Sequence, residues 1–78
     1  MKVLATIGTA IRRAREAAGI SQEELAARAA LHRTYIGGVE RGERNLGVKN
    51  LVAIARALNL APSELLRGVD PQGERRRG

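Results

Sequence analysis

The feature that most restricts the fold of this chain is a very short connection between two helical segments. Apolar residues recur with helical spacing over residues 22–29 and again over residues 33–41. Only Ala30, Leu31 and His32 separate the two segments. Two short helices on so short a joint must cross at a steep angle, so the second helix projects one of its faces outward.

The rest of the chain has the same helical periodicity, and no stretch alternates apolar and polar residues over the length of a strand. We expect a first helix that ends before Gly19 and a fourth over residues 48–58. Pro62 suits the first turn of a fifth helix that ends near Gly68. The predicted fold class is therefore all-α, in the form of a compact five-helix domain.

Short-range signals fix several helix ends and one face of each helix. Ser21 is expected to cap the helix that begins at Gln22, with the Glu24 carboxylate reaching back to complete a capping box. Asn59 can take the left-handed conformation that ends the fourth helix. The expected inward-facing side chains are Leu4, Ile7, Ile11, Ala14, Ala18, Leu25, Ala26, Ile36, Val39, Leu51, Ile54, Ala55 and Leu58.

The domain is expected to cover residues 1–68, and residues 69–78 are expected to form a flexible basic tail. That tail has one apolar residue, a Pro, two Gly and three Arg. The run Arg75–Arg77 is either a solvated end of the chain or a contact to phosphate, and charge runs are usually solvated.

Charge and composition narrow the classes of function. Fourteen Lys and Arg against eight Asp and Glu give a net charge of +6, which favours a polyanionic partner. The chain has no Cys, its single His lacks metal-ligand partners, and no nucleophile has a base at a suitable spacing. We therefore expect no enzyme activity, catalytic residue, metal, cofactor or small-molecule ligand. No apolar run is long enough for a membrane span or signal peptide, so a soluble, cytoplasmic protein is expected.

The outer face of the helix over residues 33–41 indicates which kind of polyanion is the partner. Thr34, Gly37, Gly38 and Arg41 lie opposite the apolar face, and Arg33 and Tyr35 flank it. A guanidinium suits guanine O6 and N7, and a hydroxyl with a methyl suits a base edge or a thymine methyl. In the helix-turn-helix geometry this helix enters a major groove, so the expected partner is double-stranded DNA.

A longer pattern in the sequence resembles a known family. Gln22-x-x-Leu25-Ala26, Ile36, Glu40, Gly42 and Leu51-x-x-Ile54-Ala55-x-x-Leu58 occur in one register. Together they resemble the phage repressor/Cro-type (XRE) helix-turn-helix domain, over about residues 4–67. The segments Arg33–Ile36, Glu40–Arg41 and Arg44–Leu46 are most similar to controller proteins of restriction–modification systems.

The resemblance implies a role for individual residues. The base-reading or base-adjacent residues would be Arg33, Thr34 and Tyr35. Contacts to the DNA backbone would come from Gln22, Arg41, Arg44, Asn45 and Lys49, and His32 is expected near a phosphate because it begins the helix. Arg15 and Glu40 match a family ion pair between the first and third helices. For Tyr35 an alternative remains open, in which the ring packs over the second helix and the hydroxyl stays in water.

Two positions depart from the family pattern. Ala30 stands where relatives commonly have Gly or Asn, because the backbone there is left-handed. Gly37 and Gly38 stand where relatives often carry polar side chains that contact bases. One explanation is a close approach of the helix to DNA, or a base left unread. The other is drift at positions that make no contact.

Leucines near the C-terminus indicate self-association. Leu60, Leu65, Leu66 and Val69 exceed what a short fifth helix can bury, and the resemblance places a dimer interface there. The predicted function is a sequence-specific transcriptional regulator that binds a palindromic operator as a homodimer, in the manner of a restriction–modification controller. The alternative is an antitoxin or coactivator-type module that acts mainly through a protein partner.

Overall fold

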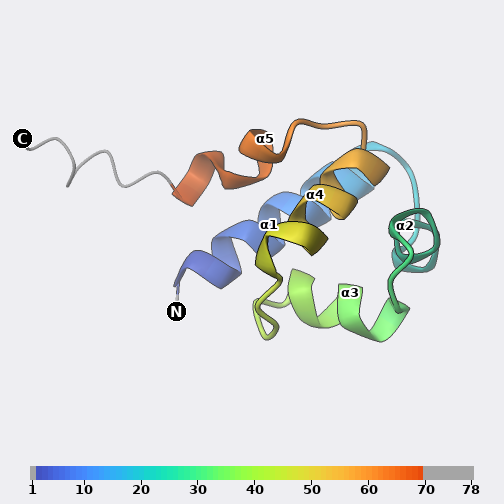
Figure 1. The fold of residues 1–78 in the computed structure, drawn as a ribbon, viewed down its shortest axis with the longest axis horizontal. Helices are drawn as coiled ribbons and strands as arrows, with labels where there is room; N and C mark the ends of the chain where they lie inside the picture. Colours follow the sequence, from blue (N-terminus) through green and yellow to red (C-terminus); the bar gives the residue numbers. More distant parts are fainter. Residues whose placement is uncertain (1, 70–78) are drawn as a thin grey trace, which may run out of the picture.

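The computed structural model describes residues 2–69, which form five α-helices followed by one short 3-10 helix (Figure 1). The α-helices are α1 (Lys2–Ala17), α2 (Gln22–Ala29), α3 (Arg33–Glu40), α4 (Gly47–Ala57) and α5 (Pro62–Leu66), and the 3-10 helix is η1 (Arg67–Val69). No strand occurs in this part of the chain. The all-α, five-helix prediction is confirmed. No helix in the described range is long and apolar enough to cross a membrane.

The basic tail expected over residues 69–78 lies outside the described residues, except for its first residue. Val69 ends η1 and packs, partly buried, against the core. The Arg75–Arg77 run belongs to the part that the structure does not describe.

The helix ends follow the local sequence with one exception. Ser21 Oγ accepts a hydrogen bond from the Glu24 backbone N–H at 3.0 Å, as expected for the N-cap of α2. The Glu24 carboxylate does not complete the predicted capping box, because it accepts a hydrogen bond from Arg28 Nε at 2.8 Å, one turn further along. Asn59, with φ of 60°, takes the left-handed conformation expected after α4.

The core collects one face of every α-helix. Its buried side chains are Ile7, Ile11, Leu25, Ala26, Ala29, Ile36, Val39, Leu46, Leu51, Ile54, Ala55, Leu58 and Leu65. Three expected core residues differ: Ala18 is exposed, because α1 ends at Ala17, and Leu4 and Ala14 are only half-buried. Leu46 was not expected in the core, since it lies in the loop before α4 and outside any helical period.

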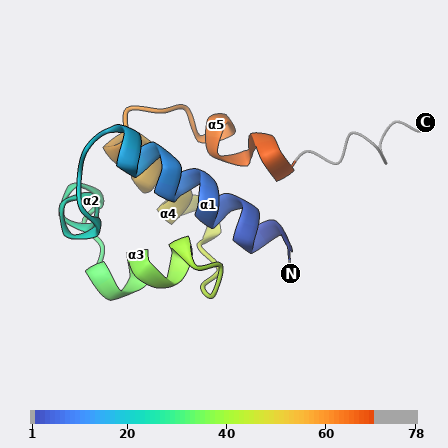
Figure 2. The ribbon, with the colours of Figure 1, turned by 180° about the vertical axis from the view of Figure 1, so that it is seen from behind.

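Helix α1 crosses the front of the domain in Figure 2, with α3 on one side of it and α5 and η1 on the other. The contact with α3 is made backbone to backbone. A Cβ atom on Gly8 would collide with the Val39 carbonyl oxygen and would lie 2.6 Å from the Glu40 carbonyl oxygen. Gly42, at φ +76°, would likewise bring a Cβ within 2.9 Å of Ala5 Cα. The end of α3 is therefore held at a fixed distance from α1.

Candidate nucleic-acid interface

The joint between α2 and α3 exposes one face of α3. Ala30 takes the left-handed conformation, with φ of 59° and ψ of 43°, and the Leu31 N–H bonds to the Ala26 carbonyl at 2.8 Å. Helix α3 then runs along one edge of the molecule (Figure 1), with Ile36 and Val39 against the core. Figure 1 shows α2 nearly end-on and α3 along its length, so the steep crossing predicted from the short joint is present. Ala30 bears the backbone strain that a left-handed conformation costs a residue other than Gly.

A buried carboxylate fixes α3 against the two preceding helices. Arg15 Nε lies 2.7 Å from Glu40 Oε2 and Nη2 lies 3.1 Å from Oε1, so the contact is bidentate. The Glu40 side chain is only 2% exposed. The hydrogen bond to Glu40 raises the pKa of the Arg15 guanidinium above its usual value. Burial acts in the opposite direction, because it disfavours the charged form. The Arg15 and Glu40 pair anticipated by the family resemblance is thus present with good geometry.

Gln22, from the start of α2, also bonds to this carboxylate. Its Nε2 donates to Glu40 Oε1 at 3.0 Å. This differs from the expectation of a phosphate contact, because one of the two amide hydrogens is committed to the protein. We call the group formed by Arg15, Gln22 and Glu40 the Glu40 network. It joins α1, α2 and α3 at one point.

The outer face of α3 carries a small polar hollow of about 200 Å³. It is lined by Gln22, Arg33, Thr34, Gly37 and Arg41. Arg33, Thr34 and Arg41 are exposed side chains, whereas Gly37 forms the buried floor. Side chains that can donate hydrogen bonds therefore surround a depression on the outer face of α3.

Two consecutive glycines make room for two arginines. A Cβ on Gly37 would lie 3.1 Å from Arg41 Nη1, and a Cβ on Gly38 would lie 2.6 Å from Arg44 Cγ. The protein's own cationic side chains thus occupy the space above these glycines. The sequence had suggested either a close approach of DNA or positions without contacts, and neither explanation included these arginines. The i,i+4 spacing of Gly37 and Arg41 could have indicated it, since helical side chains lean back over the preceding turn.

Tyr35 is half-buried, and its hydroxyl is engaged within the protein. The hydroxyl donates to the Asn45 carbonyl oxygen at 3.2 Å and accepts from Asn50 Nδ2 at 3.1 Å. The ring packs against the core, as in the alternative left open by the sequence, but the hydroxyl is not left to water. Sequence reasoning missed Asn50, because no local pattern connects a helix α4 amide with a helix α3 phenol.

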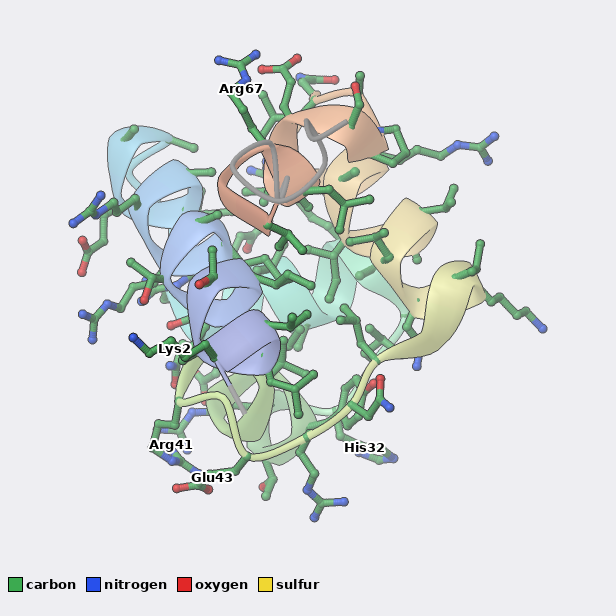
Figure 3. The ribbon with its side chains drawn as sticks, turned by 90° about the vertical axis from the view of Figure 1, so that its left-hand side faces the viewer. Lys2, His32, Arg41, Glu43 and Arg67 are labelled. Carbon is green, nitrogen blue, oxygen red and sulfur yellow. The ribbon has the colours of Figure 1, made fainter. Side chains whose placement is uncertain are left out.

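The other residues predicted to contact the DNA backbone come from the start of α3, the loop after it and the first turn of α4. His32, Arg44, Asn45 and Lys49 are all exposed. In Figure 3 His32, Arg41 and Glu43 lie at one end of the molecule, whereas Arg67 lies at the opposite end. Arg41 Nε also pairs with Glu43 Oε1 at 3.1 Å, in an exposed contact. Three exposed arginines, Arg33, Arg41 and Arg44, therefore lie on α3 or on the loop that follows it.

The C-terminal leucines are divided between core and surface. Leu65 is 1% exposed and belongs to the core, so it is not available for the dimer contact expected of it. Leu66 is 37% exposed, and Leu60 and Val69 are half-buried. The exposed apolar surface at this end is therefore smaller than the sequence indicated.

Elsewhere the described residues offer little chemistry. A wider groove of about 550 Å³ follows α1 beside η1 and is lined by Lys2, Ala5, Thr6, Thr9, Ala10, Arg13 and Gly68. These side chains contain no acid and no histidine. Within residues 2–69 no group of three or more His, Asp or Glu side chains is placed to hold a metal ion.

Comparison with known proteins gives matches over the same helices. A family model described as helix-turn-helix matches residues 11–65. The chain is 48% identical over 56 residues to control protein C.SmaI of Serratia marcescens. The aligned segment covers 72% of this chain and 67% of that protein. The restriction–modification controller protein C.AhdI from Aeromonas hydrophila has a similar structure, with a TM-score of 0.82 and 45% identity, over 83% of this chain and 98% of that one.

A second similar structure contains operator DNA. It is the controller protein C.Esp1396I as a tetramer in complex with its natural 35-base-pair operator, with a TM-score of 0.77 and 34% identity over 86% of this chain and 88% of that one. Structures of C.Esp1396I also exist for variants at an arginine, a threonine and a tyrosine that occupy consecutive positions of that protein.

The Glu40 network predicts a large loss of stability when its carboxylate is removed. Glu40→Ala leaves the partly buried Arg15 guanidinium without its carboxylate, with only the Ile20 carbonyl oxygen still accepting from Nη1 at 2.9 Å, and we expect unfolding free energy to fall by about 3 kcal/mol. The matched control is Glu43→Ala, which breaks an exposed arginine pair and is expected to cost less than about 1 kcal/mol. Urea unfolding of both variants measures the difference. Equal losses would contradict the assignment of the network as the joint between the helices.

Proposed function

The chain belongs to the helix-turn-helix family of the phage repressor/Cro (XRE) type, and we propose that it is the transcriptional regulator of a restriction–modification system. It binds a palindromic operator in double-stranded DNA as a homodimer, with α3 in the major groove. The observation that carries the proposal is the outer face of α3, which exposes Arg33 and Thr34 beside the polar hollow. Bound dimers exclude the polymerase or, when suitably placed, recruit it.

Sequence is read at the start of α3. Arg33 is exposed and can present two parallel N–H groups to O6 and N7 of a guanine. Thr34, beside it, offers a hydroxyl to a base edge and a methyl to thymine. Support comes from C.Esp1396I, whose solved variants concern the same three residue types, in the same order, as Arg33, Thr34 and Tyr35 here.

Affinity comes from the cations around α3. Arg41, Arg44 and Lys49 neutralise phosphates on either side of the groove, and Asn45 and His32 add hydrogen bonds to the backbone. The second amide hydrogen of Gln22 is available to a phosphate while the first remains on Glu40. Because each neutralised phosphate releases counterions, binding weakens steeply with added salt.

The dimer contact lies away from the DNA. Leu66, with the half-buried Leu60 and Val69, forms the apolar surface on the α5 side, and α5 and α3 lie on opposite edges of the domain (Figure 1). In the proposed twofold dimer each copy of α3 reads one half-site of the same duplex. The half-sites of the operator are then about 34 Å apart, one helical turn.

Arg33→Ala tests base reading directly. We expect affinity for a duplex selected by the wild-type protein from a randomised pool to fall by about 1–3 kcal/mol, with preference lost at one base pair per half-site. Fluorescence anisotropy against duplexes changed at single positions measures both effects. Arg67→Ala is the matched control, since Arg67 is an exposed arginine at the opposite end of the molecule (Figure 3). Unchanged affinity and preference in Arg33→Ala would overturn the proposed role.

Gly37→Ala tests whether DNA uses the hollow. The new Cβ would lie 3.1 Å from the flexible end of Arg41 and 3.6 Å from Gln22 Oε1, an ordinary contact distance, so the fold tolerates it, and the helix is stabilised by about 1 kcal/mol through better propensity. The methyl group also takes up part of the hollow and displaces the Arg41 guanidinium, so DNA affinity should fall by about three- to tenfold. Thermal unfolding and anisotropy are therefore expected to change in opposite directions. Affinity that stays constant or rises with stability would exclude the hollow from the interface.

A further inference from the structure

The loop between α3 and α4, residues 41–46, has anchors of different kinds along its length. Its first part continues the hydrogen bonding of α3, with Gly42 N–H on the Val39 carbonyl at 3.0 Å and Glu43 N–H on the Gly38 carbonyl at 2.8 Å. At its end the Leu46 side chain is buried, at 6% exposed. Between these two anchors lie Arg44 and Asn45, both exposed.

The segment between the anchors is held by Tyr35. The Tyr35 hydroxyl donates to the Asn45 carbonyl at 3.2 Å, and within residues 2–69 this is the one hydrogen bond recorded for the backbone of Arg44 and Asn45. Asn50 Nδ2, from α4, donates to the same hydroxyl at 3.1 Å and so orients its proton towards the loop. We call this group of Tyr35, Asn45 and Asn50 the Tyr35 bridge.

The chemistry of the hydroxyl limits what else it can do. A phenol has one proton to donate, and in the Tyr35 bridge that proton is on the Asn45 carbonyl. Phosphate oxygens only accept hydrogen bonds, so a contact from Tyr35 to the DNA backbone would have to break the bridge. Tyr35 is also half-buried, whereas Arg33 and Thr34 beside it are exposed.

We propose that Tyr35 is a positioning residue, which fixes the α3–α4 loop so that Arg44 and Asn45 meet the DNA backbone already ordered. The proposal rests on the proposed function and refines it, because it assigns Tyr35 a role other than reading a base. Ordering the loop before binding removes a conformational entropy cost that each immobilised side chain would otherwise impose.

The position of Arg44 depends on this loop. Its aliphatic stem lies over Gly38, where a Cβ would be 2.6 Å from Arg44 Cγ. Tyr35 and Gly38 are one helical turn apart on α3 and hold the loop on either side of Arg44. A movement of the Asn45 backbone therefore shifts the guanidinium relative to the reading face of α3.

The first test uses the protein without DNA. Tyr35→Phe keeps the packed ring and removes only the hydroxyl. We expect the backbone NMR order parameters of residues 44–46 to fall from about 0.85 towards 0.6, with those of α3 and α4 unchanged. Order parameters that stay constant in the variant would overturn the proposal, whatever the DNA-binding result.

The second test measures DNA binding by fluorescence anisotropy on two duplexes, one selected by the wild-type protein and one of scrambled sequence. We expect Tyr35→Phe to weaken binding to both by about three- to tenfold, as the loss of one ordered backbone contact predicts. The salt dependence should fall by about one phosphate at most, and base preference should be retained. In an Asn50→Ala background the effect of Tyr35→Phe should be smaller, because the two residues act through one bridge.

Two outcomes of the second test count against the proposal. A loss confined to the selected duplex would mean that Tyr35 contacts a base itself, and unchanged binding to both duplexes would mean that the loop needs no ordering. Wild-type protein that retains no duplex from the randomised pool would instead contradict the proposed function, and the order parameters still decide whether the Tyr35 bridge orders the loop.

Discussion

The carboxylate of Glu40 is the interaction on which the orientation of the reading helix depends. It is almost fully buried and accepts hydrogen bonds from Arg15 on α1 and from Gln22 on α2. A buried carboxylate is costly unless its oxygens are paired, so the arrangement of these three helices is strongly specified. The backbone contact at Gly8 acts on the same end of α3 and leaves no space for a different packing distance.

The rigidity of that joint has consequences on the outer face of α3. Because α3 cannot shift easily, Arg33 and Thr34 have a defined position relative to the rest of the domain. Gly37 and Gly38 then allow Arg41 and Arg44 to lie close to the helix backbone. In the proposed interface, cations held in place before binding would lose less conformational freedom on contact with phosphate, which would compensate for the small number of side chains proposed to read bases.

Much of this architecture could be predicted from the sequence because it depends on local rules. Helix periodicity, the Ser21 cap and the short joint at Ala30 each involve residues within a few positions of one another, and all are present in the structure. The Arg15 and Glu40 pair spans 25 positions, and it was anticipated only through the family resemblance.

What the sequence could not supply were partners chosen by tertiary packing. The Glu24 carboxylate had two possible hydrogen-bond donors within reach, the backbone of Ser21 and the Arg28 side chain, and the sequence pattern does not show which one it bonds to. Periodicity places Tyr35 beside the outer face but does not show that the loop returns a carbonyl to its hydroxyl. Leu65 and Leu66 are adjacent, and only the docking of α5 decides which one is buried.

We propose that two copies of α3, each fixed by its Glu40 network, read a duplex in neighbouring turns of the major groove. The most direct test is to sequence the duplexes that the wild-type protein retains from a randomised pool. We expect inverted half-sites about 34 Å apart, each with a conserved guanine at the base pair that Arg33 contacts. Retained duplexes with no inverted repeat, or no enrichment over the starting pool, would contradict it.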